Sequence, residues 1–544
     1  MGGGNTSTEE VEKQNSYMQR IREASQMRAS QPLAYVDTYG CQQNEADSEK
    51  LRGMLCEMGY GITDDEFKAD VIMINTCAIR ENAENRVYGN VGALVHTKKA
   101  KPSQVIAFCG CLAGVPETVE KIRQSYRHVD LVFSPDKLWR FPELLYRALS
   151  VKGRVFDTEV GDGFITEGIP SHRDGKIKAW LPIMYGCNNF CSYCIVPYVR
   201  GRERSREPEA ILDEARALAA EGYKDIMLLG QNVNSYGGGM NLGGAAHAST
   251  AQPNTARPNT ARPNTERLGA LRTSGSAYGQ DADACGGEMR PGLMRKAEIP
   301  SEQPVSAIIE PNTQSSATEK VNFATLIRRI NEIDGEFLIR FMTSHPKDAS
   351  IDLFRAMAES EKAAKHIHLP FQAGSDRILR LMNRGYTRSG YLEKIEAARE
   401  YMPDIVITSD VIVGFPGETD EEFEETLKLV EKAQFDAMFT FIYSKRPGTP
   451  AAKLEDTTTR EEKQVRFDKL IDLQNAISEE KHAQYVGKTV RVLVDAESHD
   501  ERYPLKARTN GGRLVHLLGG AELLGKYVDV TITHSNSWSL FGEA

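Results

Sequence analysis

Three cysteines in one short stretch have the residue type and spacing of ligands for a soft metal centre. Cys187, Cys191 and Cys194 stand in "GCNNFCSYC" at a C-x3-C-x2-C spacing, directly after the apolar run "LPIMY". Thiolates select zinc, copper or iron–sulfur clusters. A structural zinc site takes four ligands, whereas three thiolates on a 4Fe–4S cluster leave one iron open for an exogenous ligand. The spacing therefore favours a catalytic cluster; the alternatives are a zinc site with a distant fourth ligand, or packed core cysteines.

A second set of three cysteines is spread over the first 111 residues. Cys41, Cys77 and Cys111 each end an apolar run, in "LAYVDTYGC", "ADVIMINTC" and "QVIAFCGC". If these runs are parallel strands, their carboxyl ends meet at one edge of the sheet, where ligand sites form. We therefore expect the three thiols to converge, again without a fourth, while Cys109 packs within its strand. The alternative is three buried structural cysteines, since free cysteine is among the most buried residue types.

Strands and helices alternate in two parts of the chain, which predicts a multidomain α/β protein. Residues 32–150 indicate an N-terminal α/β sandwich with a parallel sheet. Residues 175–460 hold about six strand–helix units, which fit a partial (β/α)6 barrel. A low-complexity insertion with the repeat "AQPNTARPNTARPNTERL" interrupts them at 238–320. Short β-rich runs at 482–544 predict a small antiparallel β-barrel, and the polar residues 1–31 are expected to be a disordered tail.

Composition narrows the class of protein further. The 544 residues carry a formal net charge of −9, contain nine cysteines and include no apolar run of about 18 residues. The N-terminus has no apolar segment typical of a secretory signal, so we expect a cytoplasmic protein without a membrane span. In a reducing compartment, grouped cysteines are more often ligands or catalytic thiols than disulfides. The net charge argues weakly against a nucleic-acid coat but allows a local basic groove.

Several longer stretches share the pattern of a known enzyme family. They include "TYGCQQNEADSE", "INTCAIRENAENRVYGN", "PIMYGCNNFCSYCIVPYVRGRERSR", "HLPFQAGSDRILRLMNRGYTR" and "TSDVIVGFPGETDEEFEET". Together they resemble the radical S-adenosylmethionine (SAM) methylthiotransferases from about Leu33 to Ala452, outside the insertion. The resemblance is closest to the MiaB type, which converts N6-isopentenyladenosine in tRNA to its 2-methylthio form. The C-terminal runs resemble the TRAM domain, an RNA-binding β-barrel.

The resemblance implies a two-cluster mechanism. One 4Fe–4S cluster would bind SAM at Cys187, Cys191 and Cys194, and an auxiliary 4Fe–4S cluster would be held by the other trio. A first SAM would methylate a sulfur at the auxiliary cluster, and a second would supply the radical that abstracts hydrogen from C2 of the adenine. The implied partners are tRNA carrying isopentenyladenosine and an electron donor such as a flavodoxin or ferredoxin. The sulfur donor is not implied, and we expect a monomer.

Two further functions stay open at this point. Relatives within the family act on threonylcarbamoyl-adenosine in tRNA or on a ribosomal protein, and they carry other residues around the first cysteine. "TYGCQQNEADSE" favours the isopentenyladenosine type, although the family often has Met at the position of Gln43. The non-enzymatic alternative is a zinc-containing protein that binds RNA.

Other residues are candidates for binding the cofactor. Gly230, Gln231 and Asn232 end the run "DIMLLGQN", where this superfamily contacts the amino group of SAM, and an ordinary turn is the alternative. Gly414 lies in "SDVIVGFPGET", which resembles the superfamily segment beside the adenine of SAM. Ser344 and Gln372 also stand at predicted strand ends, where they line the pocket or serve as structural polar groups.

Basic residues are candidates for binding RNA. Four arginines alternate along "VRGRERSR", and at strand-like spacing they would share one face. Phosphate contacts would suit such a row, although a solvated surface is the usual explanation. The predicted RNA-binding residues are Arg200, Arg202, Arg204, Arg206, Lys488 and Arg508.

Overall fold

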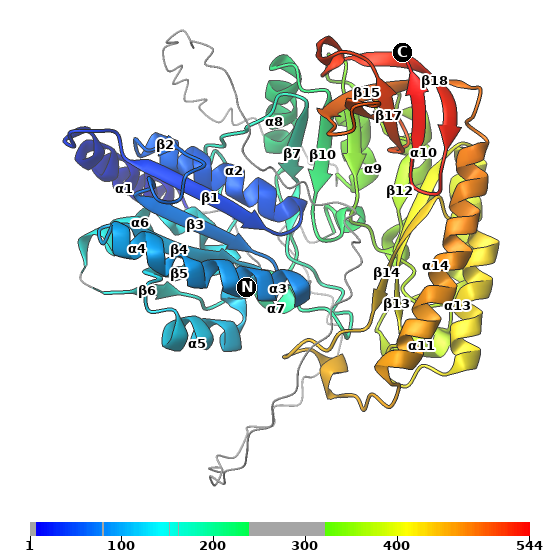
Figure 1. Ribbon diagram of the computed structural model, residues 1–544, viewed down its shortest axis with the longest axis horizontal. Helices are drawn as coiled ribbons and strands as arrows, with labels where there is room; N and C mark the ends of the chain where they lie inside the picture. Colours follow the sequence, from blue (N-terminus) through cyan, green and yellow to red (C-terminus); the bar gives the residue numbers. More distant parts are fainter. Residues whose placement is uncertain (1–6, 79–80, 152, 162, 239–320) are drawn as a thin grey trace. The chain divides into compact units, whose positions relative to one another are not determined.

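A computed structural model describes residues 7–78, 81–151, 153–161, 163–238 and 321–544 (Figure 1). The predicted insertion therefore lies outside the described residues, apart from Gly238. All the described residues belong to one compact unit of the chain. None of their helices is long and apolar enough to cross a membrane.

The N-terminal region is built around a parallel sheet of six strands in the order β2-β1-β3-β4-β5-β6. The three apolar runs predicted as strands form β1, β3 and β4. Alternate residues of β3 pack into two separate cores, Val71 and Met73 into one and Ile72 and Ile74 into the other. Side chains alternate between the faces of a strand, so both faces of the sheet are covered and the predicted α/β sandwich is confirmed. The elements are β1 Leu33–Tyr39, α2 Gln42–Glu57, β2 Gly61–Ile62, β3 Val71–Thr76, α3 Glu81–Ala93, α4 Val95–Ala100, β4 Val105–Gly110, α5 Pro116–Ser125, β5 Leu131–Phe133, α6 Phe141–Ser150 and β6 Val155–Asp157.

The predicted disordered tail is wrong for most of its length, because α1 spans Thr8–Gln26. The Ser7 hydroxyl caps the helix by accepting a hydrogen bond from the backbone N–H of Glu10. Ile21 is buried, and the Gln14 amide exchanges hydrogen bonds with Glu143 at the start of α6. Only this narrow stripe is buried, so the helix keeps the polar composition that suggested disorder.

Six parallel strands and their helices form the central region, as predicted. Strands β7, β10 and β11 make one three-stranded sheet, and β12, β13 and β14 make another. A parallel bridge between Ile339 and Ala363 links β11 to the segment that leads into β12. One core runs through both sheets, so the region is a partial (β/α)6 barrel. Its elements are β7 Lys178–Pro182, β8 Met184–Tyr185, α7 Val196–Arg200, β9 Arg204–Ser205, α8 Pro208–Ala220, β10 Asp225–Leu229, α9 Phe323–Asn331, β11 Leu338–Phe341, α10 Ile351–Glu359, β12 His366–His368, α11 Asp376–Leu381, α12 Arg388–Tyr401, β13 Val406–Val413, α13 Asp420–Ala433, β14 Ala437–Ile442 and α14 Arg460–Ala483.

The C-terminal region is a closed barrel of five strands in the order β15-β16-β17-β19-β18. Four of its pairs are antiparallel, as predicted, but β17 and β19 run parallel. This difference arises because β18 pairs with β15, so β19 must return beside β17 to close the barrel. The strands are β15 Thr489–Glu497, β16 Leu505–Thr509, β17 Leu514–Leu518, β18 Tyr527–Ser535 and β19 Leu540–Glu543.

A buried arginine attaches this small barrel to the amino ends of the central strands. The Arg340 guanidinium donates to Asp225 Oδ2 at 2.9 Å, and to the backbone carbonyls of Thr509 and Asn510 at 3.0 and 2.8 Å. Asp225 is the first residue of β10, and both ionic side chains are almost fully buried. A single guanidinium therefore joins two strands of the central barrel to the turn between β16 and β17.

Replacing Arg340 with methionine is expected to lower the free energy of unfolding by about 3–5 kcal/mol, since Asp225 would be left as a buried charge without its partner. Urea denaturation would measure the loss, and limited proteolysis would show whether residues 482–544 detach. The matched control is Arg340→Met combined with Asp225→Leu, which should recover most of the lost stability. Equal stability of the single and double variants would contradict this account.

Candidate functional site

The cysteines near the N-terminus lie together at the carboxyl edge of the first sheet. Cys41 follows β1 and precedes α2, Cys77 follows β3, and Cys111 begins the short 3-10 helix η1, Cys111–Gly114, after β4. These three strands are neighbours in register, which brings their ends to one edge. The thiol of Cys77 lies within hydrogen-bonding reach of both other thiols. We call these three residues the auxiliary trio.

Electrostatics favour thiolates at two members of the auxiliary trio, Cys41 and Cys111. The hydrogen bond from the Cys77 thiol lowers the pKa of Cys41 to about 6 and that of Cys111 to about 7. Sharing its proton with both neighbours raises the pKa of Cys77 itself. The Arg200 guanidinium adds positive charge, because its Nε donates to Cys111 Sγ at 3.1 Å and its terminal nitrogen donates to Asp47 at 2.9 Å. Thiolate is the form in which cysteine binds metal, so these residues fit an iron–sulfur cluster.

Cys109 and Cys111 are only two residues apart at the end of β4, yet they pack in different cores. Gly110 has φ 88°, and a Cβ at this position would meet the Thr76 carbonyl oxygen at 2.3 Å. Only glycine fits such a turn, which places Cys111 in the core on one face of the sheet. Cys109 packs in a core, as predicted, but this core lies on the opposite face of the sheet, and burial raises the pKa of its thiol.

The other three cysteines, which we call the barrel trio, lie in the loop after β8. The loop is pinned by backbone hydrogen bonds from Cys187 N to the Gly201 carbonyl and from Cys194 N to the Cys191 carbonyl. The Arg384 guanidinium, itself buried, donates to Cys191 Sγ at 3.3 Å. Burial raises the pKa of Cys187 to about 11 and that of Cys194 to about 12. A metal centre would ionise these thiols on binding, as it does coordinating thiols in general.

A single metal ion and a 4Fe–4S cluster place different demands on three thiols. In the described part of the chain, no three Cys, His, Asp or Glu side chains surround one point as the ligands of a single metal ion would. In a 4Fe–4S cluster each cysteine binds a different iron, so its sulfurs do not have to meet at one point.

Helix α7 connects the two trios. It starts two residues after Cys194 and ends at Arg200, whose side chain contacts Cys111. Ile195 and Val199 pack in the same core as Cys111, so the helix rests on the turn that holds this cysteine. Its five residues span about 7.5 Å, so the loop of the barrel trio and the contact with Cys111 lie at opposite ends of one short helix.

Buried polar atoms without partners gather at the carboxyl ends of the barrel strands. Among the described residues, Gln231 Oε1 and Asn232 Oδ1 after β10 accept no hydrogen bond, and His345 Nε2 after β11 has no partner. Such atoms are costly in a closed protein interior, so they fit a polar ligand bound at this end of the barrel. The others here belong to Ser192, Asn234, Thr440 and Tyr443.

The six residues predicted to bind the cofactor all lie at this end of the strands. Gly230 leaves no room for a side chain, because a Cβ would meet Met184 Cγ at 2.4 Å. Gln372 and Gly414 both have positive φ, 67° and 70°. The remaining three are Gln231, Asn232 and Ser344. Sequence reasoning missed Asn234 and Tyr443, although each follows a strand by a few residues, which was the available signal.

Three of the four alternating arginines are buried and engaged within the protein. Arg200 binds Asp47 and Cys111, and Arg206 binds Glu167 and Glu214. The predicted strand-like row is wrong, because Arg200 ends α7.

Arg204 is buried too, and its guanidinium donates to the Arg200 carbonyl. These three side chains are therefore not available to RNA in this structure. Arg202 is exposed above the Phe190 ring, 4.5 Å from its centroid. Lys488 is exposed as well, and Arg508 is half-buried beside Asp495.

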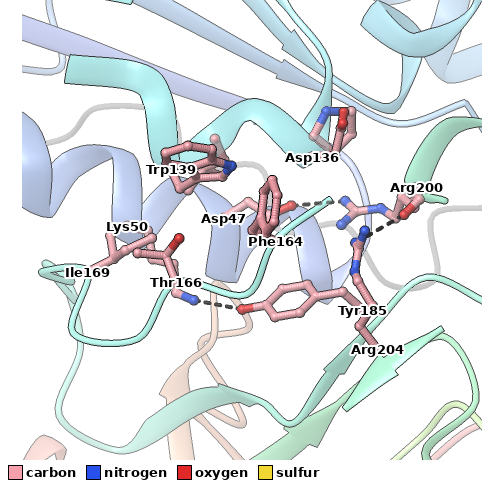
Figure 2. A pocket seen from close by; sticks show the side chains of 12 residues that line it. Asp47, Lys50, Asp136, Trp139, Phe164, Thr166, Ile169, Tyr185, Arg200 and Arg204 are labelled. Carbon is pink, nitrogen blue, oxygen red and sulfur yellow. Dashed lines mark hydrogen bonds and ion pairs between the residues drawn. The ribbon is translucent and has the colours of Figure 1, made fainter. Parts of the chain in front are cut away.

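A small pocket of about 50 Å³ is lined in part by Arg200, the arginine that contacts Cys111 of the auxiliary trio (Figure 2). Figure 2 shows Asp47 and Arg200 turned toward each other, with Lys50 beside Tyr185. Lys50 Nζ donates to the Tyr185 hydroxyl at 2.8 Å, which links α2 to the strand before the cysteine loop. Residues of the N-terminal region and of the central region therefore meet around Arg200. No sequence pattern indicated this contact.

Comparisons with known proteins agree on all three regions. Residues 33–134 match the model of the uncharacterized protein family UPF0004, residues 181–284 and 300–430 match the radical SAM superfamily, and residues 483–544 match the TRAM domain.

Relatives of similar length carry one name. The tRNA-2-methylthio-N(6)-dimethylallyladenosine synthase of Acetivibrio thermocellus is 43% identical over 540 residues, which cover 98% of this chain and 96% of that protein. The enzyme of the same name from Thermoanaerobacter sp. is 41% identical over 98% of this chain and 97% of its own. Among solved structures, the radical S-adenosylmethionine methyltransferase TsrM from Kitasatospora setae is similar with a TM-score of 0.48 and 12% identity, over 78% of this chain and 75% of that one.

Proposed function

Because this chain belongs to the tRNA-2-methylthio-N(6)-dimethylallyladenosine synthase family of radical SAM enzymes, we propose that it methylthiolates C2 of N6-isopentenyladenosine next to the anticodon of tRNA. We propose further that it uses two SAM-dependent steps and two 4Fe–4S clusters, one at each cysteine trio. The observation that carries this proposal is the pair of trios, each with three thiols and no fourth among the residues that the structure describes, joined through α7 and Arg200.

The residues around the barrel trio would bind SAM and the cluster that cleaves it. A 4Fe–4S cluster at the barrel trio would supply the electron that cleaves the sulfonium bond of SAM. Gln231, Asn232 and His345 would accept or donate hydrogen bonds to SAM with the polar atoms that are left without partners. The deep burial of Cys187 and Cys191 would keep water away from the reacting atoms.

Arg200 is the residue best placed to organise the auxiliary trio. Its guanidinium holds Cys111 and Asp47 together and contributes positive charge beside sulfur ligands that carry negative charge. Cys41, Cys77 and Cys111 would hold the auxiliary cluster, which would supply the sulfur to be transferred. Since Arg200 ends the helix that begins after Cys194, the same side chain fixes the spacing between both sites.

Two alternative functions remain to be compared with this proposal: another methylthiotransferase substrate, and a zinc protein without enzymatic activity. Action on threonylcarbamoyl-adenosine in tRNA, or on a ribosomal protein, would use the same trios and is distinguished by its product. The non-enzymatic zinc protein is not supported, because the chain matches the radical SAM superfamily and full-length relatives named as synthases. A flavodoxin or ferredoxin as electron donor, a cytoplasmic location and a monomeric state belong to the proposal as well.

The decisive experiment is anaerobic reaction with defined substrates. The protein, reconstituted with iron and sulfide and supplied with SAM and a reductant, is incubated with tRNA that carries isopentenyladenosine. We expect mass spectrometry of the digested nucleosides to show the 2-methylthio form. The matched control is the same tRNA without the isopentenyl group. Product only on threonylcarbamoyl-adenosine or on ribosomal protein would reject the proposed substrate.

A further inference from the structure

A row of aromatic rings crosses the outer face of the C-terminal barrel. His516 on β17 lies opposite Phe541 on β19, which lies opposite His534 on β18. The rings of His534 and Phe541 stack with centroids 4.3 Å apart and planes 4° from parallel, and those of His516 and Phe541 stack at 5.0 Å and 17°. Tyr503, from the loop before β16, lies 5.1 Å from Phe541. We call these four residues the ring row.

The ring row faces away from the core of its own barrel. Val515 and Leu517 flank His516 along β17, and Leu540 precedes Phe541 on β19; all three are fully buried inside the barrel. Side chains alternate across a strand, so the rings point outward. His534 is exposed and the other three rings are half-buried. The stacking therefore supplies little to the barrel core, and a stacked, partly exposed ring surface remains at the face.

The surroundings of the ring row suit RNA. Lys506 on β16 lies directly opposite His516 and extends the row with a cation within reach of a phosphate. Arg502 is exposed beside Tyr503. Aromatic and imidazole rings stack on unpaired bases, and neighbouring cations bind the backbone in proteins that recognise single-stranded nucleic acid. Protein interfaces are also rich in aromatic residues and arginine, so the feature that favours RNA is the parallel stacking of the rings with Lys506 beside them.

We propose that the ring row is a stacking site for an unpaired base of the substrate RNA, with Lys506 beside the adjoining phosphate. This inference rests on the proposed function, because it assumes that RNA is the substrate. Each stacked base contributes affinity with little dependence on sequence. The row would thus help to hold the RNA while another base enters the catalytic site.

The test compares variants that keep or remove the aromatic face. Binding of an isopentenyladenosine-containing anticodon stem-loop is measured by fluorescence anisotropy at one fixed salt concentration, with the reconstituted full-length protein. We expect Phe541→Leu and His534→Ala each to weaken binding about 5- to 100-fold, and Phe541→Tyr to bind within threefold of the wild type. Leu518→Ala is the matched control, since Leu518 is an exposed apolar residue of β17 without a ring.

Two further readouts separate the possible failures. SAM cleavage without RNA should be unchanged in every variant, and thermal unfolding should show that each barrel is intact. Unchanged RNA affinity in Phe541→Leu would overturn the proposal and leave the row as a docking surface for protein. A wild type that binds the RNA through the row but forms no methylthio product would reject the proposed function while leaving the ring row supported.

Discussion

Replacing Cys191 with alanine is expected to abolish SAM cleavage. Cys191 is the middle cysteine of the barrel trio, and the buried Arg384 donates a hydrogen bond to its sulfur, so alanine would remove one of the three proposed ligands. Iron content should fall from about eight to about four atoms per chain, since only the auxiliary cluster would remain. Formation of 5′-deoxyadenosine under anaerobic reduction should drop to background. Iron assay and chromatography of the nucleoside products measure both effects.

The control for this prediction is Cys56→Ala. Cys56 lies near the end of α2, outside both trios, and it is half-buried. That variant should keep its iron and its activity, which shows that loss of a thiol alone has no effect. Retention of full SAM cleavage in Cys191→Ala would disprove the assignment of the barrel trio.

Replacing Cys77 with alanine should separate the two halves of the reaction. Cys77 is the thiol that contacts both other members of the auxiliary trio, so its loss removes the centre of that set. We expect loss of about four irons per chain and no methylthio product. SAM cleavage should persist, because the barrel trio is intact. Parallel measurement of 5′-deoxyadenosine and of modified nucleoside gives the two results from one reaction.

Cys109→Ala is the matched control, because Cys109 is buried in β4 only two residues from Cys111 but packs on the opposite face. It should reduce stability through lost packing while leaving iron content and product unchanged. Were Cys77→Ala to keep eight irons and full product formation, the auxiliary trio would have no part in the reaction.

The barrel trio could be located from the spacing of its cysteines, and the auxiliary trio from the strand patterns that precede each of its cysteines. Continuous apolar runs identified buried parallel strands, and the carboxyl ends of such strands are where ligands bind. Cys41, Cys77 and Cys111 therefore could be brought together although they are more than thirty residues apart. The partial barrel followed from the same alternation of strands and helices.

What the sequence did not predict depends on contacts between distant segments. Helix α1 was missed because its burial is one narrow stripe against α6, which polar composition hides. The arginine row was misread because alternation suggests a strand, whereas Arg200, Arg204 and Arg206 each bind groups within the fold. The spacing of the arginines along the chain cannot reveal that Asp47 pairs with Arg200 or that Glu214 pairs with Arg206. The parallel closure of β17 on β19 also depends on the order of strands, not on their individual patterns.

The attachment of the C-terminal barrel has a consequence for substrate size. Arg340 and Asp225 fix that barrel to the amino ends of the central strands, while the barrel trio lies after their carboxyl ends. A five-residue strand is about 17 Å long, so a ligand that touches both ends must reach at least that far. If both the C-terminal barrel and the barrel trio bind the substrate, a folded anticodon arm is long enough to reach both, whereas a free nucleoside reaches only one of them.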